Sequence, residues 1–378
     1  MSRKLSGIKA PVSELFISDG KRTPTRGAGV RLLVLSCIAG AVTFALLNPA
    51  TGDDSKATSA IPASVLSGIP VDARGDLVVI GSDGVTHKTV RSSGGDLKTP
   101  AVTAGQYQDE NGVEIAAPQW LPPSATRGFA RGSAAMAIFE DKQTGPFHGV
   151  YSQPGYSFEE AEVYLPSDHA RPPGLYLHRP GSTDTAYVYL GGQSRTGGAV
   201  DAGFQHSPSR DNWALFITCE GFPFHVSRFQ RFASGQTVDI RFFVPADNYV
   251  AVSASGLDIT GRHVTRTVVL DVDKYPSTAP PAPGTLAGQS TRFTWTASGD
   301  GNILKRMTSI AQHRQSWSTR SFMRGIRWRN VRIGKGADRL HEWTFDDEAE
   351  TVNWPDKRHI VVDARTPADE TVNILLNR

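Results

Sequence analysis

The stretch "GQTVDIRFFVPADNYVAVSASGLDITGR", residues 235–262, places two apolar runs on either side of an Asp-Asn pair. Both runs, 238–245 and 249–256, are rich in β-branched and aromatic residues, a composition typical of strands. Asp and Asn tolerate the backbone conformations of tight turns. The stretch therefore predicts two neighbouring strands joined by a turn.

Similar short runs, bounded by Gly, Pro, Asp or Asn, recur along the chain, and they indicate an all-β protein. They cover a hairpin at 76–90 and strands at 160–166, 174–180, 185–191, 266–273, 292–298, 325–334, 341–345, 359–364 and 371–376. No apolar stripe of helical period longer than three turns follows residue 48. Strands of this length and spacing predict a β-sandwich or jelly roll. We expect the proline-rich stretch 276–283 to be a loop inside one sandwich, with an interdomain linker as the alternative.

The stretch 235–262 resembles the hairpins of concanavalin A-like lectin and glucanase sandwiches, and "RGIRWRNVRIG" (324–334) resembles a late strand of those domains. "LDVDKYPST" (270–278) is similar to the metal-binding strand of legume lectins, where Asp271 and Asp273 take ligand positions. The later ligands of that pattern fall on alanines, Ala282 and Ala287. The resemblance implies a concanavalin A-like jelly-roll sandwich. We expect no cofactor, with Ca²⁺ as the alternative that the legume pattern leaves open.

The N-terminal part predicts export. Leu32–Leu47 is an uncharged apolar run of 16 residues that follows a leader rich in Lys and Arg. Positive charge before such a run keeps the leader in the cytoplasm and sends the rest across the membrane. We expect a leader at 1–31, a signal or transmembrane anchor at 32–47, a linker with a hairpin at 48–109 and the sandwich at 110–378. The protein is then extracellular or at the cell surface.

Charge and cysteine content exclude several classes of protein. The net charge of +3 does not indicate a nucleic-acid partner, and Cys219 is the only cysteine after the apolar run. A disulfide-stapled domain and a cysteine-rich zinc site are therefore excluded. The chain also has no phosphate-binding glycine loop, no dinucleotide fingerprint and no nucleophile elbow.

The most suggestive polar segment is "TGGAVDAGFQHSPSRDNWALF", residues 196–216. Alternation along 199–206 predicts that Val200, Ala202 and Phe204 face the core, so that Asp201 and Gln205 share the other face. Carboxylates and amides bind pairs of sugar hydroxyls. The predicted ligand-binding residues are Asp201, Gln205, Asp211 and Asn212. The alternative is a hairpin and a turn, with Trp213 in the core.

Two further groups of residues are candidates for chemistry. Nine Lys and Arg residues between 305 and 335 occur without an acidic residue among them, and Arg324, Arg327 and Arg329 are the predicted anion-binding residues. A solvated strand face is the alternative. Glu160 with Glu162, and Asp271 with Asp273, lie two apart on a strand, a spacing that permits the two carboxylates of glycoside hydrolysis. They do not match the E-x-D-x-x-E pattern of sandwich-fold glucanases.

These patterns favour a lectin-like, carbohydrate-binding protein without catalytic activity. Its partner would be a glycan or a cell-wall polymer, and the arginines indicate an acidic one. A glycan-cleaving enzyme on the same fold, either a glycoside hydrolase or a polysaccharide lyase, is the first alternative. A structural surface protein is the second.

Overall fold

The computed structural model describes the backbone of residues 76–80, 86–90, 145–178, 184–194, 199–207, 210–219, 222–224, 231–272, 294–312 and 319–376. Side chains are described in the same ranges except at 76–80, 86–90, 219 and 222–224. The described chain is all-β, and its single helical element is the 3₁₀ turn η1 (Ala337–Arg339). Within these residues no helix is long and apolar enough to cross a membrane. The expected apolar segment 32–47, the proline-rich loop 276–283 and most of the linker lie outside them.

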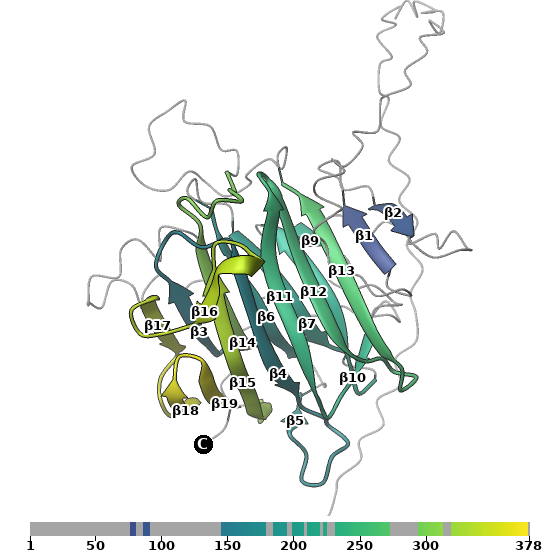
Figure 1. Ribbon diagram of the computed structural model, residues 1–378. Helices are drawn as coiled ribbons and strands as arrows, with labels where there is room; N and C mark the ends of the chain where they lie inside the picture. Colours follow the sequence, from purple (N-terminus) through teal and green to yellow (C-terminus); the bar gives the residue numbers. More distant parts are fainter. Residues whose placement is uncertain are drawn as a thin grey trace, which may run out of the picture. The chain divides into compact units, whose positions relative to one another are not determined.

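The strands form two sheets (Figure 1). The 11-stranded sheet has the order β18 (Ile360–Thr366), β19 (Asp369–Leu375), β15 (Phe322–Gly334), β4 (Phe158–Leu165), β11 (Gln236–Ala246), β12 (Tyr249–Leu257), β13 (His263–Asp271), β1 (Asp76–Ile80) and β2 (Thr86–Val90). Two short strands, β16 (Leu340–Glu342) and β5 (Leu175–Tyr176), also pair with β15. All of its pairings are antiparallel except that of β1 with β13.

The second sheet is antiparallel throughout its described pairings. Its order is β10 (Arg231–Ala233), β8 (Asn212–Cys219), β7 (Ala199–His206), β6 (Thr185–Gln193), β14 (Ile303–Ala311), β3 (Phe147–Ser152) and β17 (Glu348–Trp354), and β9 (Phe222–Phe224) pairs with β8. Because β14 pairs with β6 and β15 with β4, strands on both sides of the stretch 276–283 belong to the same two sheets.

The two sheets pack face to face as a sandwich around one large apolar cluster. Alternation supplies the inward side chains of each strand. On β4 the exposed fraction alternates along the strand, with Ala161, Val163 and Leu165 buried. On β7 the predicted inward residues Val200, Ala202 and Phe204 are in the cluster, as are Trp213, Leu215 and Ile217 of β8. The predicted facing of β7 is confirmed, and Trp213 lies in the core.

Three predicted strands are wrong or too long, and the one predicted at 341–345 ends at Glu342 with β16. Residues 294–298 of the predicted strand 292–298 form a turn instead. The Asp247 carboxylate accepts a hydrogen bond from the Ala297 N–H, and Asn302 bonds the backbone of Thr296. These side chains satisfy backbone groups that a sheet would otherwise pair. Of the predicted strand 174–180, the described residues 174–178 contain only the two strand residues of β5. Conversely, β14 and β17 were not predicted.

Candidate functional site

Asp201 and Gln205 share the outer face of the second sheet, opposite the core. Their cross-strand partners are Gly191 and Tyr187 on β6, and Thr218 and Ala214 on β8. Gly203 lies between them, and a Cβ there would lie 2.5 Å from the Cα of Tyr189. The close approach of β6 therefore leaves no room for a side chain between the acid and the amide.

The Asp201 carboxylate is already paired. Lys305 Nζ lies 2.5 Å from its Oδ1, and both side chains are 3% exposed. Burial raises the pKa of Asp201, and the charge of Lys305 opposes that rise. An open sugar site needs a carboxylate with free acceptor positions in contact with solvent. Asp201 does not have that environment.

Gln205 is 1% exposed, and neither atom of its amide group has a hydrogen-bond partner among the described residues. Around it, Tyr187, Tyr189 and Phe216 pack edge to face, with ring centroids 5.3 to 6.4 Å apart. A buried amide without a partner costs free energy. The face is aromatic and enclosed, and the amide of Gln205 is among the polar groups that the described neighbours leave unsatisfied.

Asp211 and Asn212 lie elsewhere, at the β7–β8 turn. The Asp211 carboxylate accepts hydrogen bonds from the Ser167 hydroxyl and the Asp168 N–H, and His206 Nε2 lies 3.2 Å from it. Partial burial raises the pKa of Asp211, but these donors outweigh that effect and hold the pKa well below its usual range. Asn212 Oδ1 accepts a hydrogen bond of 2.7 Å from Arg231. The structure therefore does not bring the four predicted ligand residues into one site.

One group of metal-ligating side chains occurs among the described residues. Asp168, His169 and Asp211 each offer a ligand atom, and these atoms lie within 4.8 Å of one another. His169 is 80% exposed, and its Nε2 lies 3.3 Å from Asp168 Oδ1. Two carboxylates and an imidazole suit a borderline cation such as Zn²⁺. Their present partners are one another and the donors around Asp211.

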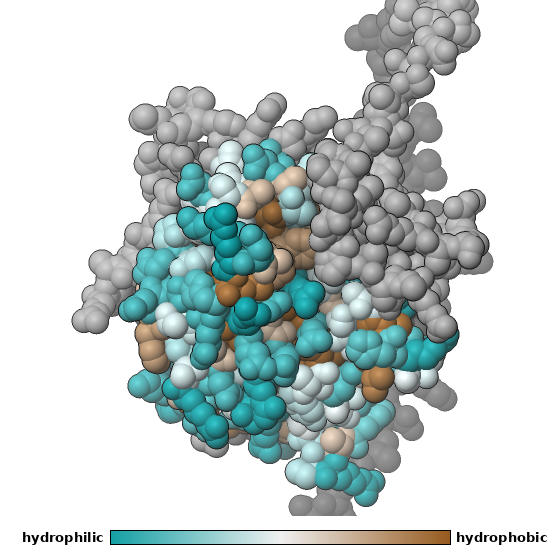
Figure 2. All heavy atoms as spheres, viewed as in Figure 1, coloured by the Kyte–Doolittle hydropathy of each residue, from teal (hydrophilic) through white to brown (hydrophobic). Residues whose placement is uncertain are grey.

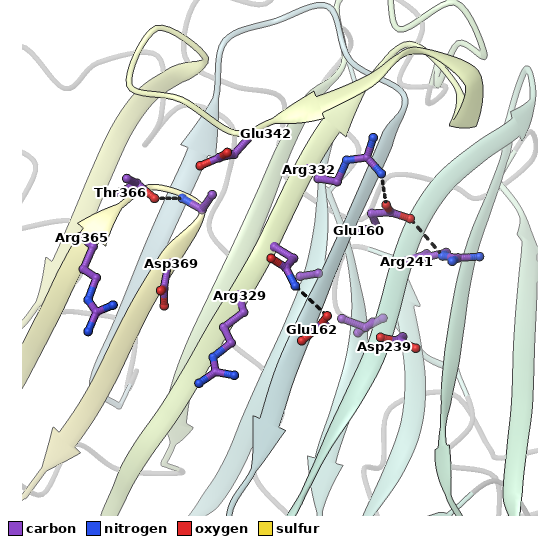
Figure 3. A pocket seen from close by; sticks show the side chains of 14 residues that line it. Glu160, Glu162, Asp239, Arg241, Arg329, Arg332, Glu342, Arg365, Thr366 and Asp369 are labelled. Carbon is purple, nitrogen blue, oxygen red and sulfur yellow. Dashed lines mark hydrogen bonds and ion pairs between the residues drawn. The ribbon is translucent and has the colours of Figure 1, made fainter.

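A groove of about 750 Å³ lies on the outer face of the 11-stranded sheet (Figure 3). Strands β4, β11, β15, β18 and β19 supply most of its lining, and Figure 2 shows mostly hydrophilic side chains on this side of the molecule. The charged and polar lining residues are Glu160, Glu162, Asp239, Arg241, Arg329, Asn330, Arg332, Glu342, Arg365, Thr366 and Asp369. Guanidinium and carboxylate groups thus alternate in one open depression.

Glu160, a predicted carboxylate, is held between two arginines. It lies directly opposite Arg241 on β11 and Arg332 on β15. Arg241 Nε is 3.2 Å from Glu160 Oε2, and Arg332 Nη1 is 3.0 Å from Oε1 (Figure 3). Both oxygens of Glu160 are therefore occupied by charged donors.

Glu162 lies in the next row, between Asp239 of β11 and Arg329 of β15. Asn330 Nδ2 donates a hydrogen bond of 2.7 Å to Glu162 Oε1. Partial burial of the Asp239 carboxyl group and the negative charge of Glu162 raise the pKa of Asp239. Two carboxyl groups with different environments therefore lie side by side.

The predicted anion-binding arginines are separated along β15. Arg329 lines the groove, whereas Arg327 is paired with Asp369 at 3.3 Å. The Arg324 guanidinium lies over the ring of Phe322, 4.3 Å from its centroid. In the groove, Arg329 and Arg365 are exposed and make no hydrogen bond or ion pair with other described residues. The guanidinium groups of these two arginines are therefore open to solvent in the groove.

Of the other two carboxylates of the sequence hypothesis, Asp271 is not among the lining residues of the groove. Asp271 ends β13 opposite Tyr249, and Asp273 lies outside the described residues. Asp239, Arg365 and Asp369 were missed by the sequence reasoning. Alternation along β11 could have shown that Asp239 and Arg241 point outward together. It could not have shown that β4 lies next to them.

No protein-family model matches the chain, and no curated protein matches it. Among solved structures, it is similar to Scytalido-glutamic peptidase with a peptide-based transition state analog, at a TM-score of 0.37 and 8% identity over 61% of this chain and 98% of that one. It is also similar to SCP-B, a member of the Eqolisin family of peptidases in a complex with the tripeptide Ala-Ile-His. That match has a TM-score of 0.36 and 8% identity, over 61% of this chain and 98% of that one.

Proposed function

We propose that the chain binds an acidic glycan in the groove on the 11-stranded sheet, as a lectin-like protein. The observation that carries this proposal is the pair of exposed guanidinium groups, Arg329 and Arg365, that have no ion partner among the described residues. Planar guanidinium groups bind carboxylate and sulfate groups in a bidentate manner. The anionic substituents of a glycan would lie against these two arginines.

The rest of the lining suits the hydroxyl groups of such a glycan. Glu162 and Glu342 offer carboxylate oxygens, which accept hydrogen bonds from sugar hydroxyls, and Thr366 offers a hydroxyl. A volume of about 750 Å³ is in the range of ligand-binding sites. The arginines themselves supply the positive charge, so we expect binding to need no metal and to survive chelation of Ca²⁺.

The proposal is tested by measuring the binding of uronate-containing, sulfated and neutral glycans to the full-length chain. Replacement of Arg329 and Arg365 by Ala should weaken binding of the acidic glycans at least ten- to a hundredfold, because each lost charged hydrogen bond contributes about 1.5–3 kcal/mol. The affinity should fall with added salt. Arg358→Ala is the matched control, since Arg358 is 81% exposed and pairs with Asp356 outside the groove.

Equal affinity of the double variant and the wild type would refute the groove as the site. Absence of binding to every glycan would favour the alternative of a structural surface protein. Binding that is lost on chelation would instead favour a Ca²⁺-dependent site.

We also propose that the apolar segment Leu32–Leu47 exports the chain or anchors it, so that the sandwich faces the outside of the cell. The support is the positive charge of the leader and the absence of charge in the run itself. A reporter that is active only outside the cytoplasm, fused after residue 378, should be active. An inactive reporter in an expressed fusion would contradict export.

For the finer fold class we propose a concanavalin A-like jelly roll. Its support is the hairpin of β11 and β12 and the late strand β15, which carry the resembling motifs. Comparison of the complete strand connectivity in a crystal structure with that of the concanavalin A-like sandwich tests this assignment.

A further inference from the structure

Glu162 and Asp239 form a cross-strand pair of carboxyl groups in the groove. They are direct partners in the antiparallel register of β4 and β11, and Figure 3 shows their side chains next to each other. Direct partners on one face of a sheet have Cβ atoms roughly 4.5–5.5 Å apart. The two carboxyl groups can therefore reach the same bond of a bound ligand.

The surroundings of the two groups differ in a way that separates their roles. Glu162 accepts a hydrogen bond from Asn330, and Arg329 lies directly opposite it on β15, so an amide donor and a guanidinium group neighbour its carboxylate. For Asp239, partial burial and the charges of Glu162 and Glu160 raise the pKa, while Arg241 and His263 oppose the rise. A carboxylate thus lies beside a carboxyl group that holds its proton more strongly than usual.

The geometry points to a hydrolytic activity in this groove: Asp239 and Glu162 cleave a glycosidic bond of the bound acidic glycan. This inference rests on the proposed function, because the arginines that hold the anionic substituents also place the sugar chain over the pair. Partners whose Cβ atoms lie roughly 4.5–5.5 Å apart can bring their carboxyl groups to the separation of about 5–5.5 Å found in retaining enzymes.

The reaction would take place in two steps. In the first, a Glu162 oxygen forms a bond to the anomeric carbon while the glycosidic C–O bond breaks, and the leaving oxygen takes the proton of Asp239. In the second, a water oxygen bonds to the anomeric carbon and the bond to Glu162 breaks. The Asp239 carboxylate takes the proton of that water, which restores both groups.

Glu160 does not compete for either role. Both of its oxygens lie 3.0–3.2 Å from an arginine nitrogen, so both are engaged by guanidinium groups and neither is free to act on a sugar. The pair that can do acid–base chemistry is therefore Glu162 with Asp239, across two strands, rather than Glu160 with Glu162 along one strand.

The test incubates the full-length chain with hyaluronan, polygalacturonate and chondroitin sulfate, and measures reducing ends and binding in parallel. Asp239→Asn and Glu162→Gln should each slow release of reducing ends at least about a hundredfold. Asp239→Asn should leave the dissociation constant within about threefold of the wild type. Asp363→Asn is the matched control, because Asp363 is an exposed acid of β18 outside the groove lining.

The possible results separate the two proposals. Binding without release of reducing ends overturns the hydrolytic inference and leaves the proposed function intact. Release that survives Asp239→Asn, or products that carry the ultraviolet absorbance of an unsaturated uronate, also overturns it. If no glycan is bound or cleaved, both proposals fail.

A measurement without substrate gives an independent answer. In an NMR titration of the aspartate side-chain carbons, Asp239 should titrate above the ordinary range, and Glu162→Gln should lower its pKa. An ordinary pKa for Asp239 in the wild type, or no change in the variant, overturns the pairing on which the inference depends.

Discussion

At Glu159 the alternation of β4 places an acidic side chain between the two sheets. Glu159 is 0% exposed, and neither of its oxygens has a hydrogen-bond partner among the described residues. Burial raises the pKa of Glu159 well above its usual range, although the nearby Arg306 opposes the rise. The residue is therefore protonated in the folded protein at pH values where the unfolded chain has released the proton.

Replacement of Glu159 by Gln should make the protein less sensitive to rising pH. Because the pKa is raised on folding, the wild type loses stability as the pH rises above about 4.3, the value in the unfolded chain, by up to about 1.4 kcal/mol per pH unit. Gln has nearly the same shape and no proton to lose. In denaturant unfolding, the variant should gain stability relative to the wild type between pH 4 and pH 7. An equal difference in the free energy of unfolding between the variant and the wild type at pH 4 and pH 7 would contradict the prediction.

Glu370 is the opposite case, a buried acid with charged partners. Arg306 Nε donates to it at 3.0 Å and His148 Nε2 lies 3.2 Å away. Burial opposes ionisation, but Arg306 and His148 outweigh it and lower the pKa of Glu370 to about 2. Its stabilising contribution is therefore present above about pH 4.3 and is lost as the pH falls toward 2.

Removal of the Glu370 carboxylate should be costly. Glu370→Ala leaves the Arg306 guanidinium, 1% exposed, without this partner, and we expect a loss of about 3–5 kcal/mol in the free energy of unfolding. Asp369→Ala is the control on the same strand, since its pair with Arg327 is about one-third exposed and should contribute less than about 1 kcal/mol. Similar losses in urea unfolding for both variants would disagree with this account.

Within single strands, the irregularity of β15 decides which side chains enter the groove. The register with β4 shifts between Arg329 and Arg332, and Asn330 has a φ of 51°, in the left-handed region. The extra residue of this bulge resets the alternation, so that Arg329 and Arg332 are both exposed while Val331 between them is buried. A regular strand would have placed Arg329 and Arg332 on opposite faces.

Substitutions at Asn330 should separate the bulge from the hydrogen bond to Glu162. Asn330→Gly keeps the left-handed backbone, whereas Asn330→Val opposes it, because a β-branched residue rarely has a positive φ. We expect Val to be less stable than Gly by about 1–2 kcal/mol in denaturant unfolding. Both variants lose the side-chain donor to Glu162. Equal stability of the two variants would argue against a strained bulge.

Across the whole molecule, hydrogen bonds join the two sheets inside the apolar core. Trp328 of β15 donates its indole N–H to the Thr308 hydroxyl of β14 at 3.0 Å, and both residues are fully buried. Together with the contact of Arg306 and Glu370, this bond fixes how one sheet lies on the other. The packing of the two sheets therefore determines which side chains of β15 face the core and which face the groove.

Thr308→Val should destabilise the sandwich, since it leaves the buried indole N–H without an acceptor, at a cost of about 1–3 kcal/mol. Thr308→Ser keeps the hydroxyl and should recover much of that loss. Tryptophan fluorescence and far-UV circular dichroism should report one transition in each variant, because both sheets share one core. A Ser variant as unstable as the Val variant would exclude the hydrogen bond as the cause.

Strands with local signals could be predicted from the amino-acid sequence. Alternation along 199–206 showed which side chains face the core, and β-branched and aromatic runs indicated β11 and β12. The period of two acts within a few residues, so such patterns can be seen in the sequence. The pattern also predicted a strand where residues 294–298 form a turn. The side chains that stabilise this turn, Asp247 and Asn302, lie outside the predicted strand, so its local pattern does not reveal them.

Which strands are neighbours, and therefore which side chains form the site, depends on contacts between distant parts of the chain. Glu162 accepts its hydrogen bond from Asn330, 168 residues further along the chain, and it faces Asp239 across a strand pairing that no local pattern reveals. Lys305 and Arg306 were one basic group in the sequence, yet they point to opposite faces of β14 and bind Asp201 and Glu370. Pairing depends on how two sheets share one core, a property of the whole chain rather than of any segment.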